Sequence, residues 1–181
     1  TETRSFQAEL SSALPWLHAM RVDPFAQIEE YKAARWPETG NAVLIIDDAA
    51  TWLFEQGSRL DYTHTLTKVI TRNGLSEWGE AEIPLGSVLL NIRTLKEDGS
   101  SFYATPDMRQ NTVSLPSLQV GDFVEIEYLH PAANKDTWPG TLGAAFFFGM
   151  FNTASFHSRY SLFVPPGIPF QYHIANGAPQ P

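Results

Sequence analysis

Five histidines are the residues of this chain best suited to acid–base chemistry or metal binding near neutral pH: His18, His64, His130, His157 and His173. No two of them stand at the i,i+2 or i,i+4 spacing of a local metal motif, so a zinc site would have to assemble from distant strands. His64 and Lys68 fall on the apolar face of a predicted strand, where an ionisable side chain needs a partner or a route to solvent. We therefore expect His64 to be a structurally satisfied histidine at a sandwich edge, and we expect no metal and no cofactor.

Nucleophiles and paired carboxylates are the next candidates for chemistry. The chain has no cysteine, which excludes a cysteine nucleophile, a thiolate zinc site and a disulfide within these residues. No Gly-x-Ser-x-Gly elbow occurs, and the neighbours His157 and Ser158, in the run Ser155–Ser161, should point to opposite faces of a strand. Three pairs of carboxylates could serve glycoside or calcium chemistry: Asp47-Asp48, Glu80/Glu82 and Glu125/Glu127. Without a calcium-loop consensus, the pattern favours exposed strand faces for all three pairs.

Aromatic residues provide the main candidate for binding. A glycine-containing stretch gathers seven of them: Trp138, Phe146, Phe147, Phe148, Phe151, Phe156 and Tyr160. Such rings suit an interdomain contact or a platform for a sugar or peptide. Three successive Phe cannot all point inward from one strand, so at least one ring must find another partner or be exposed. The pattern favours a docking surface for an adjoining domain over a ligand platform, and it predicts core positions for Trp52, Trp78 and Tyr128.

Charge and composition limit the possible partners. The 181 residues carry a formal net charge of −8 and no Lys/Arg cluster, so nucleic acid and anionic membranes are poor partners. The longest apolar stretch, residues 143–151, is shorter than the roughly 20 residues of a membrane span, and residues 1–22 do not resemble a signal peptide. The chain begins without Met and ends in Asn-Gly-Ala-Pro-Gln-Pro, so we expect it to be part of a longer polypeptide.

The elements that position these residues divide into a helical and a strand-rich part. Phe6, Leu10, Leu14 and Leu17 predict an amphipathic helix that Pro15 kinks or restarts. A second helix should begin with Asp23 as cap and Pro24 in its first turn, and it should end at Trp36-Pro37. We expect this helical pair to pack against a sheet or a neighbouring domain.

From Asn41 onward the signals are almost all strand. They predict about eight to ten strands, at residues 42–47, 50–55, 60–71, 81–84, 88–96, 102–104, 123–130, 155–164 and 170–174. The fold class is therefore mainly β, an antiparallel β-sandwich with a short N-terminal helical segment. The predicted divisions are a helical segment or linker at 1–40, a sandwich at 41–175 and a linker at 176–181.

Two strands carry detailed expectations. In the strand at 60–71 the face with Thr63, Thr65, Thr67 and Val69 should be wet, and Asn73-Gly74 should close a hairpin. The segment Leu115–Tyr128 reads as a Pro/Gly turn followed by a half-buried strand, with Val124, Ile126 and Tyr128 on one face and the two glutamates on the other.

An ordered set of motifs resembles a known family. The motifs are Glu55–Ser58, His64–Leu75, Asp98–Ser100, Leu115–Tyr128 and Val164–Gly167. In this order, across about residues 41–175, they resemble a bacterial domain of unknown function that typically precedes a transglutaminase-like (papain-like) domain. The resemblance implies a β-sandwich accessory module followed by a domain with Cys-His-Asp machinery, and it offers no catalytic residue to transfer. Residues 1–40 lie outside it, and helical repeats such as tetratricopeptide arrays sometimes precede family members.

Together the residues and the resemblance predict a non-catalytic accessory or interaction module that positions or recognises a partner for an adjacent transglutaminase-like domain. The expected partner is an adjacent domain of the same polypeptide or another protein, with a peptide or glycan as a further option. The alternatives are a stand-alone carbohydrate- or peptide-binding sandwich and a hydrolase whose residues are scattered over several strands. The family context favours a cell-envelope or secreted setting, although the residues themselves do not fix a compartment.

Overall fold

Two short helices form where the residues before position 37 predict them. In the computed structural model, which describes residues 15–54, 58–106, 111–132, 145–149, 153–177 and 179, these helices are α2 (Pro15–Met20) and α3 (Pro24–Ala34). The Asp23 carboxylate caps α3 by accepting a hydrogen bond from the Phe25 backbone N–H at 3.0 Å. Arg35 ends the helix with a left-handed φ of 49°. The predicted cap and end of this helix are confirmed, and residues 6–14 of the other predicted helix lie outside the described residues.

The strands follow in the order β1 (Ala42–Leu53), β2 (Arg59–Val69), β3 (Glu80–Glu82), β4 (Val88–Leu95), β5 (Ser101–Tyr103), β6 (Thr112–Ser114), β7 (Phe123–Ala132), β8 (Ala154–Ser155) and β9 (Ser158–Phe163). The main sheet has the order β5-β4-β7-β2-β1-β8, with β9 also paired to β1, and β3 pairs with β6 in a small second sheet. Strands β1, β2, β7, β4 and β5 are antiparallel, whereas β8 and β9 run parallel to β1. The predicted mainly β, sandwich-like fold is confirmed.

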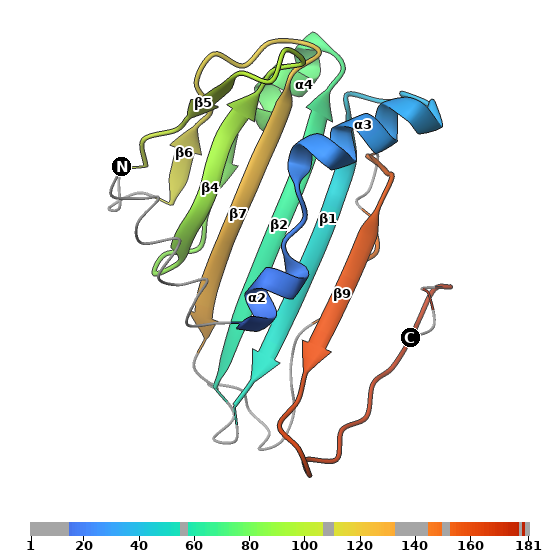
Figure 1. Ribbon diagram of the computed structural model, residues 1–181, viewed down its shortest axis with the longest axis vertical. Helices are drawn as coiled ribbons and strands as arrows, with labels where there is room; N and C mark the ends of the chain where they lie inside the picture. Colours follow the sequence, from blue (N-terminus) through green and yellow to red (C-terminus); the bar gives the residue numbers. More distant parts are fainter. Residues whose placement is uncertain are drawn as a thin grey trace.

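Both faces of the main sheet are covered over part of their area. Figure 1 shows α2 and α3 lying across one face, with α4 (Arg72–Trp78) and β6 on the opposite side. Leu17 and Met20 of α2 pack on Tyr62, and Ile28 and Tyr31 of α3 pack on Leu66. The opposite face is filled by a second apolar cluster that includes Val69, Ala81, Ile92, Val113 and Val124. The helical pair therefore packs against the sheet, one of the two arrangements that the sequence predicts.

Burial of the opposite face corrects the expected pattern of β2. Thr67 and Val69 were expected on a wet face, but they are 1% and 0% exposed. The apolar cluster beneath α4 and the β3–β6 sheet covers this end of the strand, and the sequence of β2 alone contains no sign of that cover. Thr63 and Thr65, nearer the start of the strand, are half-buried.

The turn after β2 is helical, so the predicted Asn73-Gly74 hairpin is wrong. Thr71 caps α4 by accepting a hydrogen bond from the Gly74 backbone N–H at 3.2 Å. Gly74 packs so closely that a Cβ atom there would lie 2.4 Å from the Asn41 backbone oxygen. The glycine is required here by the close approach of two backbones, and not by a hairpin turn.

Two further strand predictions differ from the structure. The ranges 42–47 and 50–55 join into the single strand β1, whose register shifts between Leu44 and Ile46. The strand predicted at residues 170–174 is absent. A strand needs a neighbouring strand for its backbone hydrogen bonds, and no described strand pairs with this segment. None of the helices in the described ranges is long and apolar enough to cross a membrane.

Candidate functional site

A row of charged residues crosses the helix-covered face of the main sheet. The ladder places Asp48 of β1 opposite His64 of β2, His64 opposite Glu127 of β7, and Glu125 of β7 opposite Arg93 of β4. Residues that are directly opposite each other in a ladder share a face, and Glu125 and Glu127, two positions apart on β7, share it too. These side chains therefore form one group on this face, which we call the charged row. Asp48, His64, Glu125 and Glu127 are each 1% exposed.

The row balances its charges internally. Glu125 accepts hydrogen bonds from Arg93 and, at 3.1 Å, from His64 Nε2. Glu127 is bonded by Arg21 Nη2 at 2.8 Å, by the Tyr62 hydroxyl at 2.9 Å and by Asn91 at 2.6 Å. Asp48 pairs with Arg159, whose guanidinium also donates to the Met20 carbonyl oxygen at 2.9 Å. Every carboxylate in the row thus faces a guanidinium group, as burial of charge requires.

Two of these arginines also fasten α2 to the sheet. Arg21 follows α2 in the chain, and the carbonyl that Arg159 binds belongs to Met20 at the end of the same helix. The row therefore joins α2 to β7 and β9 as well as joining strands to each other. This structural use explains why so much charge lies beneath the helices.

The pKa directions agree with a structural role. Burial raises the pKa of the Glu125 carboxyl, but the hydrogen bonds and charges of His64 and Arg93 outweigh burial, so the pKa lies below its ordinary value. Burial and the neighbouring Glu127 raise the pKa of the Tyr62 hydroxyl far above its usual range. Glu125 therefore remains a charged acceptor and Tyr62 a neutral donor, and neither is poised for proton transfer near neutral pH.

The burial of Glu125, Glu127 and Asp48 corrects the sequence prediction that these carboxylates lie on exposed strand faces. Asp47, on the other face, is half-buried and accepts a hydrogen bond from Ser158 Oγ at 2.7 Å. Only Glu80 and Glu82 are exposed as predicted. Sequence alternation identified the shared face of Glu125 and Glu127, but only the position of the helices shows that this face is inside.

The histidines do not assemble into a site. His64 Nε2 bonds to Glu125, but its Nδ1 is buried with no hydrogen-bond partner among the described residues, so His64 is only partly satisfied. It also lies in the middle of the sheet and not at the expected edge. His157 Nε2 lies 3.6 Å from Asp48 Oδ1, and the adjacent Ser158 bonds to Asp47. His18 and His173 are exposed, and His130 Nδ1 lies 3.1 Å from Ser87 Oγ. Within the described ranges, no three His, Asp or Glu side chains are arranged to hold a metal ion.

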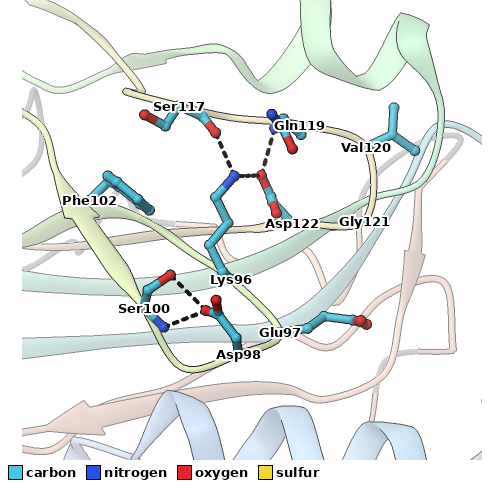
Figure 2. Close-up of a pocket in the computed structure, with 10 residues that line it drawn as sticks. All are labelled: Lys96, Glu97, Asp98, Ser100, Phe102, Ser117, Gln119, Val120, Gly121 and Asp122. Carbon is cyan, nitrogen blue, oxygen red and sulfur yellow. Dashed lines mark hydrogen bonds and ion pairs between the residues drawn. The ribbon is translucent and has the colours of Figure 1, made fainter.

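Two of the turns that carry the family resemblance, Asp98–Ser100 and the turn that begins at Leu115, meet around Lys96. They line an open depression of about 650 Å³. Figure 2 shows the Lys96 ammonium group pointing at Asp122 and at the Ser117 carbonyl oxygen, which lies 2.6 Å away. Asp122 also accepts from the Gln119 backbone N–H at 2.6 Å, and Gly121 has a φ of 96°. We call Lys96, Ser117, Gln119 and Asp122 the turn clamp. The clamp uses the charges of Lys96 and Asp122 internally, so the charged group of this lining that has no partner among the described residues is the exposed Glu97.

The predicted aromatic surface is divided between different neighbours. Phe146 stacks on Tyr160 with ring centroids 5.2 Å apart, and Phe148 meets Phe146 edge-on at 4.9 Å. Phe147 is 78% exposed and Phe148 is 41% exposed. Phe156 instead packs edge-on against Tyr31 and Trp36 of the α3 region, and Trp138 and Phe151 lie outside the described residues. The docking role of this set stays a prediction.

An apolar groove lies where β1 and β9 end. Two of its lining rings, Trp52 and Phe163, are stacked with centroids 5.2 Å apart, and Trp52 also stacks on Trp16. Residues from both strand ends line the groove: Trp52, Leu53, Phe54, Leu162, Phe163, Val164, Pro165 and Pro166. Trp52, Trp78 and Tyr128, predicted as core, are each half-buried.

These observations define a mainly β fold in which the buried carboxylates Asp48, Glu125 and Glu127 are paired with arginines. The comparisons agree with that class: residues 91–181 match the sequence profile of a domain of unknown function with a solved structure, DUF3857, and the chain belongs to this family. A search of curated proteins finds no sequence match. One similar solved structure is a protein from Parabacteroides distasonis that is named, provisionally, as a protease. It is 16% identical, with a TM-score of 0.42, over 51% of this chain and 23% of its own length.

Proposed function

We propose that this chain is a non-catalytic accessory module that positions or recognises a partner for an adjacent transglutaminase-like domain. The proposal takes its family context from the ordered turn motifs. Its physical support is the way the ionisable residues are used: Asp48, Glu125 and Glu127 are buried and paired with arginines. A catalytic acid, base or nucleophile has to reach a substrate, and these groups lie beneath helices.

The single observation that carries an interaction role is the exposure of large aromatic rings near β9. Phe147, Phe148, Phe170 and Tyr172 are 78%, 41%, 55% and 61% exposed. Scattered exposed apolar residues are ordinary, but two or more rings of this size within one short segment are typical of contact surfaces. Residues 160–177 also contain no Asp, Glu, Lys or Arg in a chain of net charge −8. An uncharged aromatic surface favours a protein partner over an ionic ligand.

A second candidate, a sugar or peptide platform, is favoured by one contact. Phe146 and Tyr160 are stacked with an interplanar angle of 17°, next to the exposed Phe147 and Phe148. Rings fixed in this way can present a flat face to a ligand. The hydrolase alternative has less support, because His64 is 1% exposed and already bonded to Glu125.

The test uses the complete polypeptide that contains this chain. Its activity on glutamine- and ester-containing substrates is compared for the wild type, for Phe147→Ser/Phe148→Ser, and for the matched exposed pair Leu85→Ser/Val120→Ser. We expect the phenylalanine variant to reduce turnover several-fold while the module's own unfolding midpoint is unchanged, and the control to behave like the wild type. Equal turnover in all forms, or a polypeptide without a transglutaminase-like domain, would contradict the proposal. Saturable glycan or peptide binding to the chain that is lost in the phenylalanine variant would instead favour the platform.

A further inference from the structure

Residues 168–174 have the sequence pattern of a β-strand, but they pair with no strand in the described structure. Phe170, Tyr172 and Ile174 alternate with Gln171 and His173, the period-two pattern that predicts a strand. In the structure the segment has no regular secondary structure. The rings of Phe170 and Tyr172 lie on one side, with centroids 6.3 Å apart, and both are more than half exposed.

The position of this segment leaves its backbone available for pairing with another strand. A turn after β9, in which the Ile168 backbone N–H donates to the Pro165 carbonyl oxygen at 3.3 Å, redirects the chain. Figure 1 shows the chain then running back on the outer side of β9, separate from that strand. Among the described residues, β9 pairs with β1 alone, and no backbone hydrogen bond reaches Phe170–Ile174.

The segment is also part of the family pattern. The match to the family profile extends through residue 181, so it includes residues 168–174. The segment therefore lies within the family domain, and large exposed rings such as Phe170 and Tyr172 are typical of contact surfaces.

We infer that residues 168–174 are a docking strand: an uncharged, extended strand of the adjacent domain pairs with their backbone and covers Phe170 and Tyr172. This inference rests on the proposed function, because the occupant comes from the adjacent domain. Pairing by strand addition obtains affinity from main-chain hydrogen bonds and specificity from alternate side chains, which is what this segment offers.

Charge and tethering select this occupant. The segment's neighbourhood, residues 160–177, has no formally charged residue, so an acidic or basic strand would lose hydration without gaining an ion pair. A strand within the same polypeptide has an effective concentration on the order of millimolar, well above that of a second copy in dilute solution. A strand of the adjacent domain is therefore favoured over exchange between two copies.

The test is amide hydrogen exchange at Phe170–Ile174, measured in the complete polypeptide and in the chain of residues 1–181. We expect exchange in the complete polypeptide to be slower by about tenfold or more, because paired amides exchange only after local opening. The variant Phe170→Ser/Tyr172→Ser should lose this protection, and Leu85→Ser/Val120→Ser should keep it.

Three results would overturn the inference. One is equally fast exchange in both forms. Another is protection of residues 1–181 that grows with concentration, which would indicate a second copy as the occupant. The third is protection of that chain at every concentration, which would indicate pairing with its own β9. The proposed function has a separate test, because it fails if Phe147→Ser/Phe148→Ser leaves turnover unchanged. If that variant does reduce turnover but exchange at Phe170–Ile174 is equally fast in both forms, only the docking-strand inference is wrong.

Discussion

At the scale of single residues, Glu125 is a buried carboxylate whose charge is held by Arg93 and His64. The side chains of Glu125 and Arg93 are 1% and 13% exposed. Glu125→Gln removes the charge but keeps the shape, so it leaves the Arg93 guanidinium without its counterion. Loss of one partner from a buried pair costs about 3 kcal/mol or more. We expect a decrease of that size in the free energy of unfolding, measured by chemical denaturation.

The matched control for this variant is Glu80→Gln on the exposed side of β3. It should change the free energy of unfolding by less than about 0.5 kcal/mol. Equal effects of the two substitutions would mean that the buried row contributes nothing particular to stability.

The same carboxylate gives the module a predicted pH dependence. The pKa of Glu125 in the folded state lies below its ordinary value of 4.5 because of His64 and Arg93, which outweigh the opposite effect of burial. A lowered pKa stabilises the fold above the unfolded-state pKa, and this contribution disappears as the pH falls through the folded-state pKa. The free energy of unfolding of the wild type should thus fall below about pH 4.5. The decline should be shallower in Glu125→Gln, and parallel curves for the two proteins would contradict this assignment.

At the scale of elements, the turn clamp joins the turn after β4 to the turn before β7. Lys96 at the end of β4 holds Asp122 and the Ser117 carbonyl oxygen, so it fixes the motif that starts at Leu115. Lys96→Met keeps most of the aliphatic stem and removes the ammonium group. We expect a loss of about 2 kcal/mol in the free energy of unfolding and faster amide exchange at residues 117–121.

Lys32→Met on α3 is the control for the clamp, because Lys32 pairs with the exposed Glu29 across a turn of the helix. Such a surface pair contributes at most about 0.5 kcal/mol. If Lys96→Met is as mild as Lys32→Met, the two turns are held by their backbones alone.

Sequence patterns predicted elements well where the signal is local. Asp23 and Pro24 mark the start of α3, and the alternation in Phe123–Tyr128 gives both the strand and its two faces. Patterns failed where a distant element decides the outcome. Gly74 lies in a helix because Thr71 caps it and Asn41 packs against it, and Thr67 is buried because α4 and the β3–β6 sheet lie over it. Neither contact can be read from the neighbouring residues.

At the scale of the whole molecule, the charged row was hidden from sequence reasoning for a similar reason. Glu125, Asp48 and Arg159 are far apart in the chain, and only the sheet order brings them to one face. The available signal was the presence of Arg21, Arg93 and Arg159 at positions that pair with carboxylates, but pairing requires the register. The exposed aromatic rings were easier to predict, since Phe146–Phe148 cannot all be buried from one strand.

The whole-molecule picture is a sheet with a balanced charged row under α2 and α3, and with uncharged aromatic segments near β9. We expect the charged row to stabilise the fold, and the exposed aromatic segments are available for contact with a partner. This division supports the proposed accessory role, because a catalytic centre needs ionisable groups that reach a substrate.

The most direct test of this account is the turnover of ester, peptide and glycoside substrates by the chain of residues 1–181. It is measured for the wild type and for His64→Ala and His157→Ala, with folding checked by denaturation. We predict no turnover above the uncatalysed rate in any of the three proteins. Turnover by the wild type that is lost in a folded His64→Ala or His157→Ala variant would contradict the account, because the histidine would then serve chemistry and not the fold.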